Sequence, residues 1–442
     1  MGLLMAKARI FINMHYMELG GAERALLGLL NALDPERVDV DLFLNQHTGE
    51  LMPLIPGHVH LLPERRGYNA IERPMATIAG EGQLGIALAR LKARWQHERY
   101  ARGLTPEQRQ MDASVFQYVA NCVDPHLPPL YDLGEYDLAI SFLQPHNVVL
   151  HKVRARKKLC WIHTDYSTVH VNAAQELPVW NGYDKVVSIS HDCTTAFLKT
   201  FPSLEPKIIE IENILSPAFV RQQAQLLDVS AEMPPSSPGG GGTKTLNILS
   251  IGRYCTQKNF ENIPFIAQQL MKLLSIGRFT HAKNYDNVPD IARRIVADHG
   301  IDDLRWYIIG FGGDEQLIRR NIDRAGMQEH VVLLGKKSNP YPYIKACDLY
   351  VQPSRYEGKS VTVREAQILC KPVVVTNYPT AHSQINDGVD GVIVPLDNEG
   401  CARGIASVMA DSALRHRLAS YLAAHDYGNE SEVNKIYKLL DT

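Results

Sequence analysis

Two glutamates, Glu357 and Glu365, stand eight positions apart in the part of the chain that offers the most chemistry. Apolar residues over 348–352 predict a strand, and the proline, serine and glycine within 353–358 mark a loop after it. A helix is predicted next, and it ends before a second buried strand over 373–375. The loop therefore carries Glu357, whereas Glu365 lies inside the helix.

The residues between the two glutamates suit an anionic ligand that also carries hydroxyl groups. Backbone amides at the start of a helix attract anions, and carboxylates accept hydrogen bonds from sugar hydroxyls. Four residues at the junction of loop and helix are candidates to bind this ligand: Gly358, Lys359, Ser360 and Val361.

A segment over 249–270 recurs 25 positions later as 274–295, with eleven of 22 positions identical. Each copy predicts a strand, a Gly-Arg loop that ends in Lys-Asn, and a helix. The first copy leaves only two residues between its helix and the next strand, which is tighter than usual. We therefore expect the second copy to occupy the site. The loop cations are, in chain order, Arg253, Lys258, Arg278 and Lys283.

Two features of the N-terminal half lie at the ends of predicted strands. Gly20 and Gly21 follow a strand over 8–14, where turn geometry is the ordinary explanation and close approach of a ligand is the alternative. His163 ends a buried strand over 158–163, a position where a lone histidine is usually structural.

The stretch around the two glutamates resembles the Glu-x7-Glu region of the GT-B retaining glycosyltransferases of family 4, which include many capsule and exopolysaccharide enzymes. Many members have Phe-Gly after the first glutamate, whereas this chain has Gly-Lys-Ser. The resemblance is strongest over 245–395. It implies an α/β fold of two doubly wound parallel-sheet, Rossmann-like domains that face each other across a cleft. The alternation of strands and helices in both halves indicates the same fold class.

The resemblance also implies roles for single residues. Glu357 would contact the transferred sugar and Glu365 the ribose of the nucleotide, while His163 would face the sugar, with Asp165 placed to orient its ring. Arg278 and Lys283 would clamp the donor diphosphate, which gains negative charge as its bond to the sugar breaks. Further donor-binding positions implied by the resemblance are Gly20, Gly21, Gly310, Gly335 and Lys336.

The implied reaction is a hexosyl transfer from a nucleotide sugar, UDP- or GDP-linked, to a hydroxyl of a glycan or a lipid-linked glycan. The resemblance implies retention at the anomeric carbon, a place in cell-surface polysaccharide synthesis, and no cofactor or metal. Two alternatives stay open. One is a nucleotide-sugar-binding protein made inactive by the repeat, and the other is a GT-B epimerase that needs no acceptor.

Length and composition agree with a globular protein of two domains. The chain has 442 residues, 45% of them hydrophobic, and a net charge of −2, so nucleic-acid binding is not expected. Seven cysteines without a CxxC pair indicate a reducing cytosol and no structural zinc. The first residues, 1–12, predict a strand rather than a signal peptide. No apolar run reaches the ~18–20 residues that span a bilayer. We expect a cytoplasmic protein whose contact with a membrane, if any, is peripheral and at its inner face.

The composition also suggests where the domains meet. Prolines, serines and four consecutive glycines over 228–243 predict an exposed linker. We expect an acceptor-side domain over 1–220, a linker over 221–245, a nucleotide-sugar-binding domain over 246–425, and a helix over 426–442 that returns to the first domain.

Residues 67–130 depart from the β/α rhythm. A helix over 86–102 carries five cations among apolar residues, and a second basic run follows over 152–158. Two interpretations stay open for this helix. It is either a solvated face of the domain or an amphipathic helix that docks on an anionic membrane.

Overall fold

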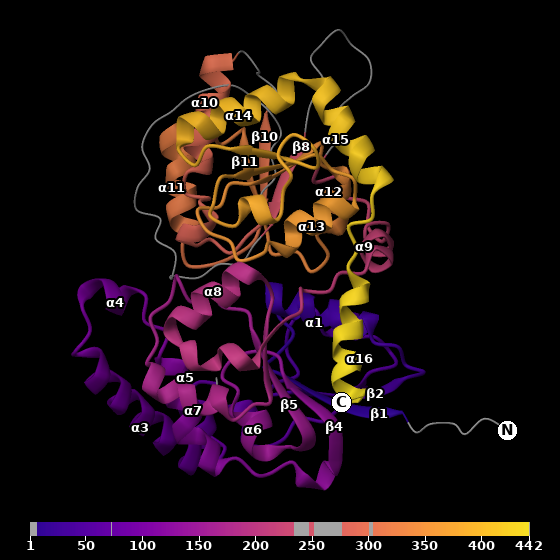
Figure 1. Ribbon diagram of the computed structural model, residues 1–442. Coiled ribbons are helices and arrows are strands. Elements are labelled where there is room, and N and C mark those ends of the chain that lie inside the picture. The colour runs from indigo at the N-terminus through magenta and orange to yellow at the C-terminus, as the bar shows by residue number, and fades with distance from the viewer. Residues whose placement is uncertain (1–6, 72, 234–246, 252–275, 300–303, 442) are drawn as a thin grey trace, which may run out of the picture. The chain divides into compact units, whose positions relative to one another are not determined.

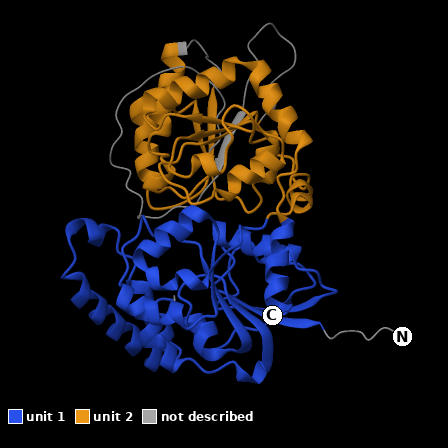
Figure 2. Cartoon of the chain, viewed as in Figure 1, with its two compact units in different colours: residues 1–214, 430–442 blue, residues 215–429 orange. Residues whose placement is uncertain are grey.

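A computed structural model describes residues 7–71, 73–233, 247–251, 276–299 and 304–441 (Figure 1). The chain divides into two compact units, which Figure 2 distinguishes by colour. Unit 1 comprises residues 1–214 and 430–442, and unit 2 comprises residues 215–429. Each unit is an α/β fold built on a parallel sheet, so the predicted fold class is confirmed.

Unit 1 contains a seven-stranded parallel sheet in the order β3-β2-β1-β4-β5-β6-β7. The last five residues of β1 are all buried, which is the pattern of a strand covered on both faces. The strands β2 and β3 lie on one side of β1, and β4 to β7 lie on its other side. Open α/β sheets bind ligands at such a switch in strand order, which here falls between β1 and β4. The strands are β1 (Ala8–Met14), β2 (Val38–Leu44), β3 (His60–Leu61), β4 (Glu135–Ser141), β5 (Arg154–Ile162), β6 (Lys185–Ser188) and β7 (Ile208–Glu210).

Helices cover this sheet, and four of them lie between β3 and β4, where the sequence departs from the β/α rhythm. The last helix of the chain also belongs to unit 1, where the Tyr437 hydroxyl accepts a hydrogen bond from the Asp34 amide at 2.7 Å. The helices are α1 (Gly21–Ala32), α2 (Met75–Gly80), α3 (Leu84–Ala101), α4 (Pro106–Gln110), α5 (Val115–Val123), α6 (Asn147–Lys152), α7 (Ala173–Asn181), α8 (His191–Thr200) and α16 (Val433–Asp441). Among the described residues, no helix combines the length and the apolar character needed to cross a bilayer.

Unit 2 contains a six-stranded parallel sheet in the order β11-β10-β8-β12-β13-β14. Its strands are β8 (Asn247–Ile251), β10 (Arg305–Ile309), β11 (Val331–Gly335), β12 (Leu349–Gln352), β13 (Val373–Thr376) and β14 (Val392–Val394). Separate apolar clusters fill its two faces, one around α10, α11 and α14 and the other around α9, α12 and α13. The helices are α9 (Pro217–Gln223), α10 (Val288–His299), α11 (Glu315–Ala325), α12 (Tyr341–Ala346), α13 (Val361–Ile368), α14 (Asn398–Ala410) and α15 (Ser412–Ala424).

Both copies of the repeat contribute to one edge of β10. Ile251, in the strand of the first copy, pairs with Ile309, and the carbonyl of Ile309 accepts a hydrogen bond at 2.8 Å from the amide of Gly277 in the second copy. Gly277 occupies the same position in its copy as Gly252 does in the first. A residue from each copy therefore contacts Ile309 of β10: Ile251 from the first copy and Gly277 from the second.

The predicted linker is wrong for its first residues. Val229 and Met233 are buried in the same apolar cluster as α9, α12 and α13 of unit 2. They fill this cluster because both are apolar residues of a segment that directly follows a packed helix. The boundary between the units accordingly falls at residues 214 and 215 rather than near residue 220. The rest of the predicted linker, 234–245, lies outside the described residues.

Candidate functional site

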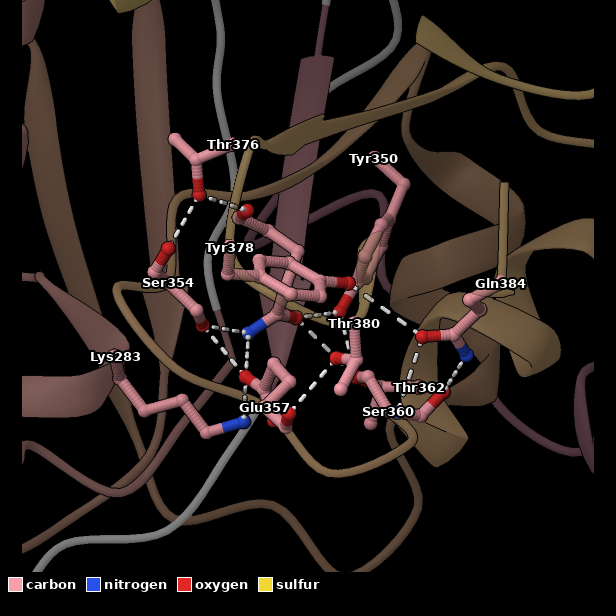
Figure 3. A network of polar contacts seen from close by, with 11 residues as sticks. Lys283, Tyr350, Ser354, Glu357, Ser360, Thr362, Thr376, Tyr378, Thr380 and Gln384 are labelled. Atoms are coloured by element: carbon pink, nitrogen blue, oxygen red, sulfur yellow. Dashed lines mark hydrogen bonds and ion pairs between the residues drawn. The ribbon is translucent and has the colours of Figure 1, made fainter. Parts of the chain in front are cut away.

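The carboxylate of Glu357 lies in the loop after β12 and is held in place by neighbouring side chains (Figure 3). Its Oε1 atom accepts hydrogen bonds from the Ser354 hydroxyl at 2.6 Å and from Gln352 Nε2 at 2.9 Å. The Thr380 hydroxyl donates to the backbone carbonyl of Glu357 at 2.8 Å. Side chain and backbone are therefore fixed independently, as a site that must be ready before a ligand arrives requires.

A lysine from the repeat reaches the same oxygen. Lys283 Nζ lies 2.5 Å from Glu357 Oε1, and the two side chains are only 13% and 9% exposed. Lys283 ends a short 3-10 turn, His281–Lys283, that follows the Gly-Arg loop of the second copy. The pair thus joins two loops that are more than seventy residues apart in the sequence.

A second contact holds these two loops together. The backbone amide of Arg355 donates to the carbonyl of Ala282 at 2.6 Å. The Arg355 guanidinium donates to both carboxylate oxygens of Asp286, each at 3.2 Å. Burial raises the pKa of Asp286 to about 7, while the positive charge of Arg355 acts in the opposite direction. A bidentate pair of this kind fixes orientation as well as distance, so it sets the position of Lys283 beside Glu357.

The loop of the second copy also carries buried polar atoms with no hydrogen-bond partner among the described residues. They are Arg278 Nε, Thr280 Oγ1 and Asn284 Nδ2. Leaving a buried donor without a partner costs about 1–3 kcal/mol, so such atoms call for an explanation. The preceding residue must be a glycine, because a Cβ at Gly277 would stand 2.1 Å from the Tyr285 ring. Together these features describe a cationic loop built to receive an acceptor of hydrogen bonds.

Glu365 is placed differently from Glu357. It lies on α13, fully buried, and its Oε1 accepts a hydrogen bond from the Tyr341 hydroxyl at 2.9 Å. The loop residues between the two glutamates, Gly358 and Lys359, are half-buried, and Val361 begins α13.

The backbone of Ser360 is already hydrogen-bonded in this structure. That amide donates to Gln384 Oε1 at 3.1 Å, and Gln384 Nε2 donates back to the Ser360 carbonyl at 2.5 Å. The Ser360 hydroxyl lies 3.1 Å from the Thr362 hydroxyl. The start of α13 is therefore tied to the segment after β13, and this amide is not open to an anion.

The other glycine-rich turn of unit 2 closes onto the neighbouring strand. The Gly310 amide donates to the Gly335 carbonyl at 2.9 Å, and Gly335 has a φ of 69°, which favours glycine. Lys336 Nζ lies 4.4 Å above the Phe311 ring. Gly310, Gly335 and Lys336 thus gather at the ends of β10 and β11. The first-copy cations, Arg253 and Lys258, lie outside the described residues.

Unit 1 places neutral imidazoles at its strand ends. His163 follows β5, its ring centroid lies 4.7 Å from that of Phe142, and its Nε2 is buried with no hydrogen-bond partner among the described residues. Burial lowers the pKa of His163 to about 3. The prediction that Asp165 orients this ring is wrong: its Oδ1 instead accepts from the amide and hydroxyl of Ser167, at 2.9 and 2.7 Å. Asp165 prefers this turn because a short carboxylate reaches the amide two residues ahead.

His146, after β4, is a second imidazole that the sequence did not single out. Its Nδ1 lies 2.8 Å from the Ser141 hydroxyl, and its Nε2 has no partner in the described part of the chain. Burial holds the pKa of His146 well below its usual value, and the neighbouring imidazoles of His15 and His163 act in the same direction. Gly20 and Gly21 lie at the start of α1, and a Cβ added to Gly21 would meet nothing within 4 Å.

Residues 246–424 match the family model described as glycosyl transferases group 1. This span contains the paired glutamates, the repeat and nearly all of unit 2. The matched span makes up most of unit 2, which is therefore similar to the glycosyl transferases group 1 family. The resemblance seen in the sequence is therefore confirmed for the family.

Curated relatives of this glycosyltransferase domain match only part of the chain. One is an N-acetylgalactosaminyltransferase of Campylobacter jejuni that acts on a diphospho-undecaprenol-linked sugar. It is 30% identical over 115 residues, which is 26% of this chain and 32% of the relative. Another is the lipopolysaccharide core glycosyltransferase LpsE of Rhizobium meliloti, 29% identical over 26% of this chain and 34% of its own length. The chain thus spans about a third of the length of these relatives.

Solved structures match over nearly the whole chain. HepE of Anabaena, in complex with UDP and glucose, has a TM-score of 0.62 and 16% identity, covering 98% of this chain and 99% of its own. At this identity the likeness concerns the fold, and it confirms the predicted GT-B fold.

Proposed function

We propose that this protein transfers a hexosyl unit from a nucleotide sugar to a hydroxyl of a glycan or lipid-linked glycan, with retention at the anomeric carbon. The observation that carries the proposal is the pairing of Lys283 with Glu357 beside a loop in which Arg278 Nε has no partner among the described residues. A cation and a carboxylate at one place suit the two halves of a nucleotide sugar, the anionic diphosphate and the hydroxyl-bearing ring.

Each residue has a stated task in this proposal. Lys283 moves from Glu357 to the donor diphosphate, and Arg278 joins it there. The freed carboxylate of Glu357, still held by Ser354 and Gln352, accepts hydrogen bonds from the sugar. Glu365 binds the ribose through the carboxylate that Tyr341 now orients.

The bond between the anomeric carbon and the diphosphate oxygen breaks as the acceptor oxygen bonds to that carbon. The nucleoside diphosphate leaves with the electron pair of the broken bond, and its leaving oxygen takes up the proton of the acceptor hydroxyl. Lys283 and Arg278 stabilise the charge that gathers on the diphosphate, so the proposed chemistry uses side-chain cations in place of a metal or cofactor. His163 is proposed to contact the transferred sugar as a neutral imidazole.

Donor and acceptor are proposed from the named relatives. UDP is the first nucleotide to test, because HepE is described in complex with UDP and glucose. A lipid-linked glycan is the first acceptor to test, because the Campylobacter jejuni relative acts on a diphospho-undecaprenol-linked sugar. We place the protein in the cytoplasm, in synthesis of a cell-surface polysaccharide. The binding-protein and epimerase alternatives are not favoured, because the named relatives are glycosyltransferases.

The test is donor binding followed by turnover. UDP, GDP, ADP and their sugars are screened for a rise in melting temperature, since a ligand that binds only the native state stabilises it. The donor that binds is then incubated with and without polyprenyl-diphosphate glycans, and released nucleotide and glycan products are measured. Product formed only with acceptor supports a transferase, and binding without any turnover supports the binding-protein alternative. If no nucleotide or nucleotide sugar shifts the melting temperature, the proposal is wrong.

A further inference from the structure

Helix α3 presents an apolar stripe to solvent. Leu84, Leu88, Leu91 and Trp95 are 60%, 65%, 49% and 60% exposed. Their spacing of four, three and four residues places them on one face of the helix. The opposite face, with the buried Ile86, Ala89 and Ala93, packs inward, where α3 contacts α5 at the edge of unit 1 (Figure 1).

This stripe is unlike the scattered exposed leucines of an ordinary surface. Single exposed apolar side chains need no explanation, whereas a contiguous apolar patch marks an interaction site. The buried face of α3 is made mainly of alanines, so the larger side chains of this helix are the ones directed outward. A helix that only covered the domain would have the reverse arrangement.

Cations flank the stripe. At 100° per residue, Lys92 and Arg99 lie on one side of it, Arg94 lies on the other, and Arg102 continues it by two turns. The Arg99 guanidinium lies 5.9 Å from the centre of the Trp95 ring. Glu98 is the one acidic residue of α3, and its Oε1 lies 3.0 Å from Arg94 Nε, so the charge of this carboxylate is offset locally.

We propose that α3 is a docking face for an anionic lipid bilayer. Leu84, Leu88, Leu91 and Trp95 enter the interfacial region, and Lys92, Arg99 and Arg102 contact lipid phosphates. An apolar stripe of leucines and a tryptophan with a basic border is the arrangement by which helices bind in the plane of a membrane. Anionic lipid attracts each cation near the membrane surface. A lipid surface suits this face better than a protein groove. Four cations surround the stripe but only one acid of α3 does, so the face has a positive charge that matches anionic lipid.

The proposal is independent of the proposed transfer reaction, since it rests on α3 alone. It is tested by sedimentation of the full chain with vesicles of phosphatidylcholine, with and without phosphatidylglycerol. Sedimentation is expected with the anionic vesicles and is expected to weaken as salt is added. Trp95 is a built-in reporter, because the other three tryptophans are buried. Its emission should shift to the blue on binding, and brominated lipid should quench it.

Variants on and off the stripe decide the outcome. Leu88→Gln with Trp95→Gln should lower the affinity for anionic vesicles about tenfold or more, because burial of apolar side chains drives interfacial binding. Arg99→Gln with Arg102→Gln should remove most of the preference for anionic lipid. The matched control, Leu226→Gln with Leu227→Gln, changes two leucines that are 57% and 56% exposed outside α3, and it should bind as the unaltered protein does. The donor-induced rise in melting temperature should be the same in every variant, which separates this proposal from the transferase assignment.

Three results would overturn the proposal. The unaltered protein could fail to sediment with anionic vesicles at low salt, or the Leu88 and Trp95 variant could sediment as well as the unaltered protein. The third is a dimer in solution that this variant converts to a monomer, without vesicle binding by either form, which would assign the face to a second copy of the chain.

Discussion

The two units have the same kind of sheet but place different chemistry at the ends of its strands. In unit 2, Lys283 and Glu357 form an ion pair that hydroxyl, amide and guanidinium groups hold in place. In unit 1, His146 and His163 carry imidazoles whose pKa values are lowered by burial, with a ring nitrogen of each left without a partner among the described residues. Charge held by neighbours suits a charged ligand, whereas a neutral imidazole suits a hydroxyl.

Burial alone therefore does not decide whether a polar side chain is charged. Glu357 and His163 both have little contact with water, but Glu357 has a cation and two neutral donors on one oxygen. His163 has aromatic neighbours, Phe142 and Trp161, and none of the described residues places an acid against its ring. Desolvation disfavours a charge unless a partner compensates for it.

The largest effect is expected from removing the lysine of the second copy. Lys283→Ala should lower transfer by about 10²–10³-fold, because a cation aimed at the developing charge of the leaving group is lost. The matched control is Lys258→Ala, the equivalent residue of the first copy, which should leave both transfer and donor binding nearly unchanged. Equal losses in the two variants would show that both copies serve the site. A loss only with Lys258→Ala would reverse the assignment.

The next effect concerns stability in unit 2. Arg355→Ala leaves the buried Asp286 carboxylate unpaired, and we expect a loss of about 2–3 kcal/mol in the free energy of unfolding at pH 8. Burial already raises the pKa of Asp286 to about 7. A carboxyl whose folded pKa lies above its unfolded value is stabilised at low pH and loses that stability as pH rises through the folded pKa. The loss should therefore be smaller at pH 5 than at pH 8.

Urea unfolding at the two pH values measures this difference. Arg320→Ala is a suitable control, because Arg320 is exposed and its Nε donates to the Gln316 carbonyl of its own helix. A loss from Arg355→Ala that is the same at both pH values would show that Asp286 stays ionised. A loss no greater than that of the control would contradict the role of Arg355 in holding the Lys283 loop.

Much of this architecture could be predicted from the sequence. The strand over 8–14 has the bounds that the sequence predicted. The position of Lys283 beside Glu357 could be anticipated only through the family resemblance, because no local pattern brings residues so distant together. No sequence pattern predicts the Arg355–Asp286 pair or the contacts that Ser354 and Gln352 make with Glu357. Each of these contacts depends on how the loops fold against one another. Asp165 was misjudged because sequence proximity to His163 said nothing about the turn it closes.

Unit 1 gives a smaller expected effect. His163→Ala should lower kcat/KM about tenfold, the loss that follows from removing one neutral hydrogen bond of roughly 1–1.5 kcal/mol. His163→Gln, which keeps a donor and an acceptor, should recover part of the activity. A loss of a thousandfold would instead indicate that His163 carries charge or a proton in the reaction.

The protonation of His163 can be measured directly. Because burial lowers its pKa to about 3, its imidazole nitrogen signals in NMR should not change between pH 8 and pH 5. A histidine with a folded pKa below its unfolded value destabilises the fold as pH falls from about 6.5 toward the folded pKa, by up to about 1.4 kcal/mol per pH unit. His163→Phe should therefore lose less stability than the unaltered protein over that range. Titration of the His163 signals near pH 6 would contradict the neutral assignment.

The smallest effect is expected from deleting one repeat length. Removing residues 250–274 joins Leu249 to Ser275, and this restores the same Leu-Ser-Ile-Gly-Arg sequence that follows Ile248 now. Ile251 pairs with Ile309, and Gly277 donates to the carbonyl of that same residue, so Ile276 should take the place of Ile251. Lys283 would remain where it is. The melting temperature and the donor affinity should therefore stay close to those of the full chain.

A deletion of the same length in another register is the matched control. Removing residues 259–283 also takes out 25 residues, but it keeps Arg253 and Lys258 of the first copy in place of Arg278 and Lys283. Both products have the Gly-Arg-x4-Lys spacing, and they should bind the donor equally well if the copies are interchangeable. Failure of both to bind would show that the second length of chain is required. That result would place part of the function in the repeat itself rather than in the strand ends of unit 2.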